Sequence, residues 1–214
     1  MADGDGGDSQ IFVRWMDAEG ATTQVTRTQN SASNLRWSPD GTQIAFTMTV
    51  DTPESEWAIE LSQEPDGADW VEGPKVVDRL SYRRDRRGYI DEGYTHVFTV
   101  PAEAGTPKQI SDGDWNHSAA EWMPDGASLI FSSLRVDEAE HEWRESEIYK
   151  AVLATGAIHQ LTDRAGPDSG PVPSPDGQYI AYQGQNFNDD TYRENELYVM
   201  SADGSNPRSL GGEM

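Results

Sequence analysis

Apolar side chains alternate with other residues after three glycines of this sequence, at the spacing of a strand with one buried face. The three stretches are "NLRWSPDGTQIAF" at 34–46, "AAEWMPDGASLIF" at 119–131 and "GPVPSPDGQYIAY" at 170–182. In each, the third and fifth residues after the glycine are aliphatic or aromatic: Ile44 and Phe46, Leu129 and Phe131, and Ile180 and Tyr182. Each stretch therefore predicts a strand with one apolar face.

The turn that precedes each of these strands is specified by three residues. They are Pro39-Asp40-Gly41, Pro124-Asp125-Gly126 and Pro175-Asp176-Gly177. Proline holds φ near about −65° at the first central position, aspartate suits the second, and glycine accepts the positive φ that closes a type I turn with a bulge. The sequence thus predicts three hairpins of one design.

A second hairpin pattern follows each of these three units, and a fourth copy precedes the first unit. It consists of a short apolar strand, a glycine-containing turn and another strand, in "QIFVRWMDAEGATTQVT" (10–26), "HVFTVPAEAGTPKQIS" (96–111), "EIYKAVLATGAIHQLT" (147–162) and "ELYVMSADGSNPRSL" (196–210). The equivalent positions Val97, Ile148 and Leu197 are 51 and 49 residues apart. The step from Ile11 to Val97 is 86 residues, which indicates an insertion between residues 47 and 94.

Two hairpins in a unit of about 50 residues are typical of one four-stranded blade of a β-propeller. The predicted fold is all-β, a partial β-propeller of three four-stranded blades and one orphan outer hairpin. The predicted segments are a disordered acidic tail at 1–9, the outer hairpin of an incomplete blade at 10–27, blades at 34–111 (with the insertion 47–94), 118–162 and 170–210, and a tail at 211–214. Because a propeller closes with about four to eight blades, we expect an arc of a larger ring.

The core is expected between adjacent blades, because each blade can bury its faces only against its neighbours. Trp37 and Trp122 occupy the same place in their units and are both predicted to be core residues. Pro171 and Pro173 stand where the second unit has Ala120 and Trp122. Since proline cannot donate to a strand ladder, we expect a short or bulged strand there.

These hairpins and three further stretches closely resemble the propeller domain of prolyl oligopeptidase-type serine peptidases, especially the acylaminoacyl-peptidase and dipeptidyl-aminopeptidase-like branch. The stretches are "VPAEAGTPKQIS", the inserted "KVVDRLSYRRDRRGYIDEGYTHVF" and "DGDWNHSAAEWMPDG". The resemblance covers nearly everything from Ile11 to Leu210. It implies a non-catalytic propeller that restricts access to a separate α/β-hydrolase domain, so that short or unfolded peptides enter and folded proteins do not. The implied partners are that hydrolase domain or further blades, and peptides in the intact enzyme.

No catalytic residue is predicted in this chain. A nucleophile elbow needs G-x-S-x-G between a strand and a helix, and the sequence contains no such stretch. We therefore expect the catalytic domain to be absent and the chain to have no peptidase activity by itself, whereas the enzymatic nature of any parent protein stays open.

TolB-like propellers share the Pro-Asp-Gly turns, so a protein-interaction propeller with no enzymatic parent is the alternative. A hydrolase with an unrecognised site is disfavoured, because no spacing places a base beside a nucleophile.

The net charge of the chain further limits the classes of partner that it can bind. The chain has 38 acidic and 16 basic residues and a net charge of −22, which disfavours nucleic acid and anionic membranes. Two explanations fit this charge equally well. One is adaptation to high salt, and the other is an acidic surface on which arginine is favoured over lysine. The sequence has no apolar run near 18 residues and no signal-peptide pattern at its start, and predicts a soluble chain of undetermined compartment.

One basic island stands out, with Arg83, Arg84, Arg86 and Arg87 followed by Tyr89. A guanidinium group can hold a carboxylate by two parallel hydrogen bonds. In the family context this island could therefore face the hydrolase domain or gate substrate. A solvated loop that balances the acidic surface is the more frequent case. The aromatic residues of the same insertion, Trp57, Trp70, Tyr89 and Tyr94, are expected to pack it onto its blade.

No metal and no cofactor are predicted. The histidines, His96, His117, His141 and His159, lack metal-ligand spacing. Asp3, Asp5 and Asp8 resemble a calcium loop, but Arg14 stands where that loop needs a glutamate. The acidic pairs Glu145 with Glu147, and Asp189 with Asp190, could bind a substrate amine, although they do not match the glutamate motif of dipeptidyl peptidases.

Overall fold

The computed structural model describes residues 8–16, 20–53, 65–68, 75–86, 88–90, 93–187 and 194–211. Several residues singled out by the sequence lie outside these ranges. They are most of the acidic tail, including Asp3 and Asp5, then Trp57, Trp70, Arg87, Asp189 and Asp190, and the last three residues.

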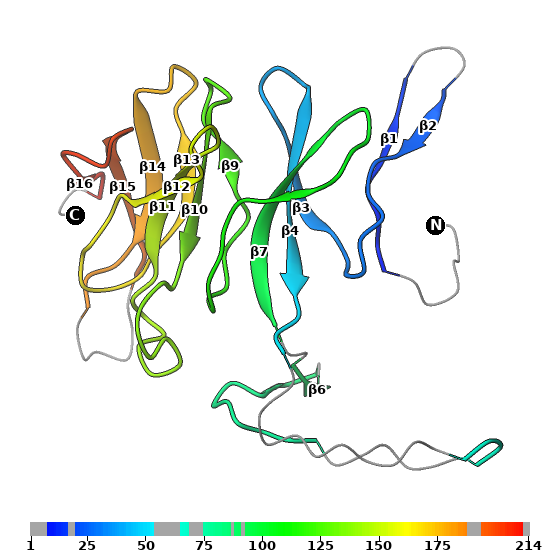
Figure 1. Cartoon of the computed structure of the whole chain (residues 1–214). Helices are drawn as coiled ribbons and strands as arrows, with labels where there is room; N and C mark the ends of the chain where they lie inside the picture. The colour runs from blue at the N-terminus through cyan, green and yellow to red at the C-terminus, as the bar shows by residue number, and fades with distance from the viewer. Residues whose placement is uncertain are drawn as a thin grey trace.

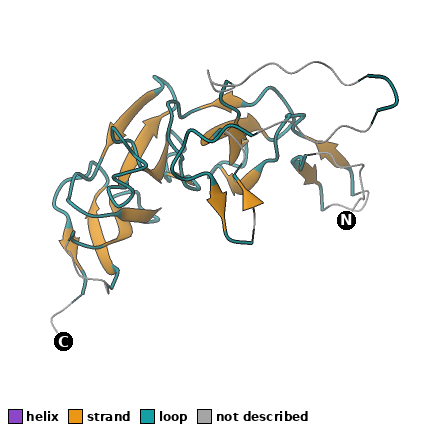
Figure 2. Cartoon of the chain, turned by 90° about the horizontal axis from the view of Figure 1, so that it is seen from below, coloured by secondary structure: helices purple, strands orange, loops and turns teal. Residues whose placement is uncertain are grey.

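Three antiparallel sheets of four strands follow one another along the chain (Figures 1 and 2). The first contains β3 (Ser33–Trp37), β4 (Gln43–Val50), β7 (Tyr94–Pro101) and β8 (Lys108–Gln109) in that order. The second contains β9 (Glu121–Trp122), β10 (Ser128–Ser133), β11 (Glu147–Val152) and β12 (Ala157–Gln160). The third contains β13 (Asp168–Pro173), β14 (Tyr179–Gly184), β15 (Glu196–Ser201) and β16 (Arg208–Ser209). We refer to these sheets as blades one, two and three.

Two further hairpins complete the described strands. β1 (Phe12–Arg14) pairs with β2 (Thr22–Gln24) before blade one, and β5 (Arg83–Arg84) pairs with β6 (Gly88–Tyr89) inside the insertion. The described residues form no helix, and therefore none that is long and apolar enough to cross a membrane. The predicted fold class, with three four-stranded blades and one orphan hairpin, is confirmed.

The three Pro-Asp-Gly turns have the predicted geometry. Gly41, Gly126 and Gly177 have φ values of 70°, 67° and 71°. Each glycine amide donates to the carbonyl oxygen three residues earlier, at 2.9 Å in all three turns. Asp40 and Asp176 also accept hydrogen bonds from the serine two residues before them, and these bonds lower the pKa of both carboxyl groups.

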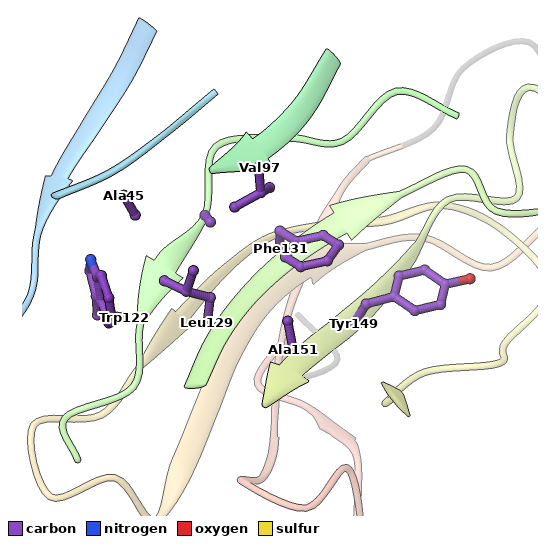
Figure 3. Packing of buried hydrophobic residues seen from close by; sticks show 8 residues of the cluster. Ala45, Val97, Trp122, Leu129, Phe131, Tyr149 and Ala151 are labelled. Carbon is purple, nitrogen blue, oxygen red and sulfur yellow. The ribbon is translucent and has the colours of Figure 1, made fainter. Parts of the chain in front are cut away.

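Each hydrophobic cluster joins two neighbouring units. Figure 3 shows the cluster between blades one and two, where Ala45 and Val97 meet Trp122, Leu129 and other residues of blade two. A second cluster joins blades two and three, and a third joins the β1–β2 hairpin to blade one. All six residues of β10 are buried. The sequence predicts one buried face for this strand. Both faces are buried, because a neighbouring blade covers each of them.

A repeated polar contact closes each of the first three outer hairpins. The hydroxyl groups of Thr26, Ser111 and Thr162 each accept a hydrogen bond from a backbone amide of the facing strand segment, at 2.9 Å; the donors are Ile11, Val97 and Ile148. The glutamine two residues before each hydroxyl residue donates its side-chain amide to that residue's carbonyl oxygen, at 2.8–2.9 Å. We call this contact the Gln-x-Ser/Thr clamp, formed by Gln24 with Thr26, Gln109 with Ser111, and Gln160 with Thr162.

The sequence prediction for Trp37 is wrong. Trp122 is 6% exposed and donates its Nε1 hydrogen to the carbonyl oxygen of Arg36 on β3, at 3.1 Å. Trp37 is 54% exposed. The reason lies in its neighbour, since within the described residues the unit before β3 contributes the β1–β2 hairpin and no inner strand beside Trp37.

The predicted irregularity of the proline-containing strand is present. β13 shifts register between Ser169 and Val172, next to Pro171. β3 has the same kind of shift between Ser33 and Arg36 and contains no proline. The inner strand of a blade is therefore irregular in blades one and three, and proline is not its only cause.

A buried polar cluster lies between blades two and three. Asp168 is fully buried and pairs with Arg164, whose guanidinium carbon lies 4.0 Å from the ring centre of Tyr198. A Cβ atom on Gly184 would lie 2.0 Å from both Arg164 Nη2 and Asp168 Oδ1, so only glycine leaves room for this ion pair. Glu147 is 5% exposed and bonds the hydroxyl of Thr162. Burial, with Asp168 nearby, raises the pKa of Glu147 to about 8.

Trp122 and Trp37 provide a test of how burial between blades contributes to stability. We expect Trp122→Ala to lower the free energy of unfolding by about 3 to 5 kcal/mol, because it removes a buried indole and leaves a cavity. Trp37→Ala should change it by less than about 0.5 kcal/mol, because that side chain is half exposed. Urea unfolding followed by circular dichroism measures both values. Equal losses in the two variants would contradict the structure.

Glu147 should make stability depend on pH. Its pKa is raised from 4.5 to about 8, so the folded protein binds one more proton than the unfolded chain between these values. The free energy of unfolding is therefore expected to fall as pH rises from about 5 to about 8, by at most about 1.4 kcal/mol per pH unit. Urea unfolding at several pH values measures the slope. Glu147→Gln cannot titrate and should flatten it, and an unchanged slope in this variant would refute the assignment.

Candidate functional site

An open cleft of about 2020 Å³ lies beside the ends of blades one and two that face away from the Pro-Asp-Gly turns. One wall comes from the insertion, including Arg79, Arg83, Arg84 and Tyr89. The opposite wall comes from residues 134–143, which connect β10 to β11. Between the two walls lie residues at the start of β7 and in the segment 114–117. The cleft is therefore formed by two blades and the insertion together.

The described segments of the insertion next to the cleft, residues 75–86 and 88–90, are called the arm here. In Figure 1 it lies below blade one, around the label β6. Its hairpin pairs Arg83 with Tyr89, and the rings of Tyr82 and Tyr89 lie 6.2 Å apart. Lys75 Nζ lies 4.8 Å from the centre of the Tyr89 ring. Through these contacts the arm folds as a small hairpin of its own.

Glu140, in the connection between β10 and β11, links the arm to blade two. One carboxylate oxygen accepts the backbone amide of Leu80 at 2.9 Å, and the other lies 3.6 Å from Arg79 Nε. The guanidinium carbon of Arg79 also lies 4.6 Å from the ring centre of Tyr94, at the start of β7. The arm thus leaves blade one and is held by blade two, so that this wall of the cleft joins the two blades.

The two walls of the cleft carry opposite charge. Residues 137–140 contribute Asp137, Glu138 and Glu140, while the arm contributes arginines. Among the described residues, Arg83 and Arg84 form no ion pair, and both are exposed. Both guanidinium groups line the cleft, and a guanidinium group can hold a carboxylate by two parallel hydrogen bonds.

The residues of the predicted basic island have different positions. Arg83, Arg84 and Tyr89 line the cleft. Arg86 is exposed at the turn of the hairpin with φ 68°, and Arg87 lies outside the described residues. Sequence reasoning missed Glu140, because a single glutamate in the acidic stretch "VDEAEHEW" gives no sign that it contacts the arm.

The described residues contain one contact between a histidine and a serine that resembles a catalytic pair. His96 Nδ1 lies 3.3 Å from the hydroxyl oxygen of Ser111. Ser111 is 1% exposed, however, and its oxygen already accepts the amide of Val97 in the second Gln-x-Ser/Thr clamp. The equivalent hydroxyl of Thr162 bonds Glu147 in the same way. Both contacts therefore stabilise the outer hairpins in which they lie. The hydroxyl groups of Ser111 and Thr162 are buried and cannot reach a substrate in the cleft.

His117, which lines the cleft, is 4% exposed, and burial lowers its pKa to about 4. Its Nδ1 lies 3.0 Å from the carbonyl oxygen of Thr95, so it carries the hydrogen. The ring is thus neutral at pH 7 and supplies no positive charge. Within the described part of the chain, no cluster of three or more histidine and acidic side chains could hold a metal ion.

A likeness to known proteins is found over most of the chain. The family described as "Dipeptidyl peptidase IV (DPP IV) N-terminal region" matches residues 47–191, about two thirds of the chain. The uncharacterized peptidase YuxL of Bacillus subtilis is 28% identical over 150 residues, which are 70% of this chain and 22% of that protein. Dipeptidyl-peptidase 5 of Porphyromonas endodontalis is 26% identical over 171 residues, with 74% and 24% covered. The chain spans roughly a quarter of the length of these two relatives.

Two solved structures share the fold. The acylaminoacyl peptidase of Pyrococcus horikoshii matches 94% of this chain and 28% of its own, with a TM-score of 0.63 and 14% identity. TolB from Acinetobacter baumannii matches 94% of this chain and 37% of its own, with a TM-score of 0.57 and 15% identity. At such low identity the likeness supports a propeller fold and nothing finer.

The contacts of Glu140 provide a test of how the arm is held. Glu140→Ala removes both the ion pair with Arg79 and the acceptor for Leu80, and should speed tryptic cleavage of the arm by about 3- to 10-fold. Glu138→Ala is a matched control from the same acidic segment and should leave the rate unchanged. Cleavage is measured by mass spectrometry of timed digests. Equal rates in the wild type and both variants would mean that Glu140 does not hold the arm.

Proposed function

The chain belongs to the family of the dipeptidyl peptidase IV N-terminal region, and from this we propose that it is the non-catalytic propeller of a serine peptidase. In this proposal the propeller gates the access of peptides to a separate α/β-hydrolase domain that carries the catalytic serine, histidine and aspartate. The likeness to peptidases of Bacillus subtilis and Porphyromonas endodontalis supports it.

The observation that carries the proposal is the arm. It lies within the residues that match the family, forms one wall of the cleft, and is held against blade two by Glu140. A wall that is fixed to both blades limits the width of what can enter the cleft. A gate of this kind requires no reactive group of its own.

The size of the cleft favours an extended peptide. Pockets for small molecules usually have volumes of about 300 to 1,000 Å³, whereas this cleft measures about 2020 Å³. A folded domain of about 100 residues has a radius of gyration of about 13 Å, and we propose that the arm hinders its entry into the cleft. Selection by size is therefore the proposed physical basis for discrimination between peptides and folded proteins.

Arg83 and Arg84 are proposed to bind carboxylates on the peptide or on the hydrolase domain. Both side chains line the cleft and have no acidic partner among the described residues. A guanidinium–carboxylate bond is charge-assisted and is stronger where water is partly excluded. In a chain with a net charge of −22, such a local positive site also attracts acidic groups that the remaining surface repels.

A TolB-like interaction propeller is the second candidate function. The fold shared with TolB of Acinetobacter baumannii supports it, because that likeness covers 94% of the chain. In this case the cleft and the arm would bind a segment of a partner protein, and no hydrolysis would follow. The two candidates differ in whether the complete protein cleaves peptides.

The proposal is tested with the protein expressed from the complete reading frame that contains this chain. We expect it to hydrolyse short fluorogenic peptides, to lose this activity with a serine-directed inhibitor, and to leave the same sequence uncut inside a folded protein. The double variant Arg83→Glu/Arg84→Glu should lower kcat/KM for peptides with a free terminal carboxylate by about tenfold, because two attractive charges become repulsive.

Two controls make this experiment specific. Arg208→Glu changes an exposed arginine on β16, outside the cleft, and should leave kcat/KM unaltered. Peptides with an amidated terminus should respond less to the double variant than peptides with a free carboxylate. A complete protein that cleaves no peptide would refute the peptidase proposal and favour the interaction propeller. Hydrolysis that is insensitive to the double variant would refute only the role of the two arginines.

A further inference from the structure

The arm and the connection between β10 and β11 carry opposite charges on one edge of the blades. Both project from the edge that faces away from the Pro-Asp-Gly turns, which is the lower edge in Figure 1. The arm presents Arg83 and Arg84. Residues 137–143 of the connection, called the acidic segment here, present Asp137 and Glu138. All four residues are exposed, and among the described residues none of them forms an ion pair.

Exposed apolar side chains accompany these charges. Leu80 and Tyr89 of the arm are 62% and 56% exposed, and Trp143 of the acidic segment is 64% exposed. All three line the same cleft as the charged residues. Tyrosine, tryptophan and arginine are enriched where proteins bind one another, and exposed apolar residues that gather on one surface mark such places. The composition of this surface is therefore that of a protein interface.

Contacts within the chain hold both elements in place. The acidic segment folds as a turn, in which the carbonyl oxygen of Glu138 accepts the amides of His141 and Glu142 at 2.8 and 3.1 Å. The arm is held beside it by Glu140, which accepts the amide of Leu80. The positions of the basic and the acidic groups are thus fixed relative to each other. A partner that meets them loses less conformational entropy than one that must first order two mobile loops.

A second copy of the chain fits this arrangement of charges. A partner of this surface must carry an acidic group opposite the arm and a basic group opposite the acidic segment. A second copy has both groups at the same separation, and a two-fold rotation presents them in the reverse order. Contacts of this kind are isologous, so each pair of residues occurs twice. Elsewhere on the surface, a net charge of −22 makes two copies repel one another.

From this pattern of charges we propose that the arm and the acidic segment form a two-fold interface between two copies of this chain. The two arginines of each copy bind the two carboxylates of the other, and the exposed apolar residues of both elements pack between these charges. The inference does not rest on the proposed function, because both elements belong to the propeller and need no hydrolase domain. It is compatible with peptide binding by the same arginines, because a guanidinium group has five N–H donors and a carboxylate occupies two of them.

Sedimentation equilibrium of the protein expressed from the complete reading frame tests this interface. At about 0.15 M salt the Debye length is about 8 Å, so repulsion between distant acidic residues is largely screened while close pairs at the interface persist. We expect a reversible dimer whose fraction rises with protein concentration.

Two double variants reverse the charges of one element each. Arg83→Glu/Arg84→Glu places acidic groups opposite acidic groups in both halves of the interface. Asp137→Arg/Glu138→Arg places arginines opposite arginines. Each double variant should raise the dissociation constant of the dimer by at least about 100-fold, because like charges then face each other.

An equimolar mixture of the two double variants should form a dimer again, with about the dissociation constant of the wild type. In this mixed dimer the glutamates of the changed arm face the arginines of the changed acidic segment, and the other half of the interface has its original residues. Energy transfer between donor-labelled and acceptor-labelled variants measures the mixed dimer. Neither a bound peptide nor a covering hydrolase domain would produce this restoration, so it is specific to a contact between two copies.

Three further variants test the specificity of these effects. Arg208→Glu on β16 and Glu103→Arg after β7 reverse exposed charges outside both elements, and should leave the dissociation constant unaltered. Trp143→Ala should raise it by about tenfold, since tryptophan is a frequent hot-spot residue. Circular dichroism and thermal unfolding verify that every variant folds as the wild type does.

Three outcomes would overturn the proposal. One is a complete protein that stays monomeric at millimolar concentration, which would leave the arm to peptides or to the hydrolase domain. Another is a dimer that neither double variant weakens, which would place the contact between copies elsewhere. The third is a mixture of the double variants that fails to restore the dimer that each of them has lost.

Discussion

The structure depends on one constraint, which is that a four-stranded sheet in this chain buries both faces only when another sheet lies on each side. β10 has a blade on both sides, and all its residues are buried. In the part of the chain that the structure describes, β3 has no inner strand before it, and all its residues are exposed. Each cluster of buried residues found there joins two neighbouring units, and none lies within a single blade. Stability is therefore a property of interfaces between units, as in other repeat proteins.

Much of the fold could be predicted from the sequence, because the governing interactions are local. Proline, aspartate and glycine determine the turns, and the alternation after each glycine indicates that a strand follows, although it does not reveal that both faces of β10 are buried. The exposure of Trp37 could not be predicted in this way. Its repeat position is identical to that of Trp122, and only the composition of the preceding unit, which is a matter of tertiary structure, distinguishes the two residues.

Only part of the candidate site could be predicted from the sequence. The basic island of the insertion was visible as an unusual local composition in an acidic chain. Glu140 was not, because its role depends on a contact across 60 residues of sequence. The Gln-x-Ser/Thr clamp was visible as "QVT", "QIS" and "QLT". Its meaning required the structure, which also explains why His96 and Ser111 lie together without forming a catalytic pair.

The row of turns, in which Pro39 lies close to Gly126 and Pro124 close to Gly177, has a consequence for how such a chain can change in evolution. A longer turn in one unit would separate the turns on either side of it, so the turn edge of the blades tolerates little variation in length. The opposite edge has no such row, and there the connections already range from the short one after β14 to the long insertion after β4. New segments can be accepted at that edge without disturbing the stacking of the blades. One edge of the molecule thus preserves the architecture, while the other is free to acquire new functions.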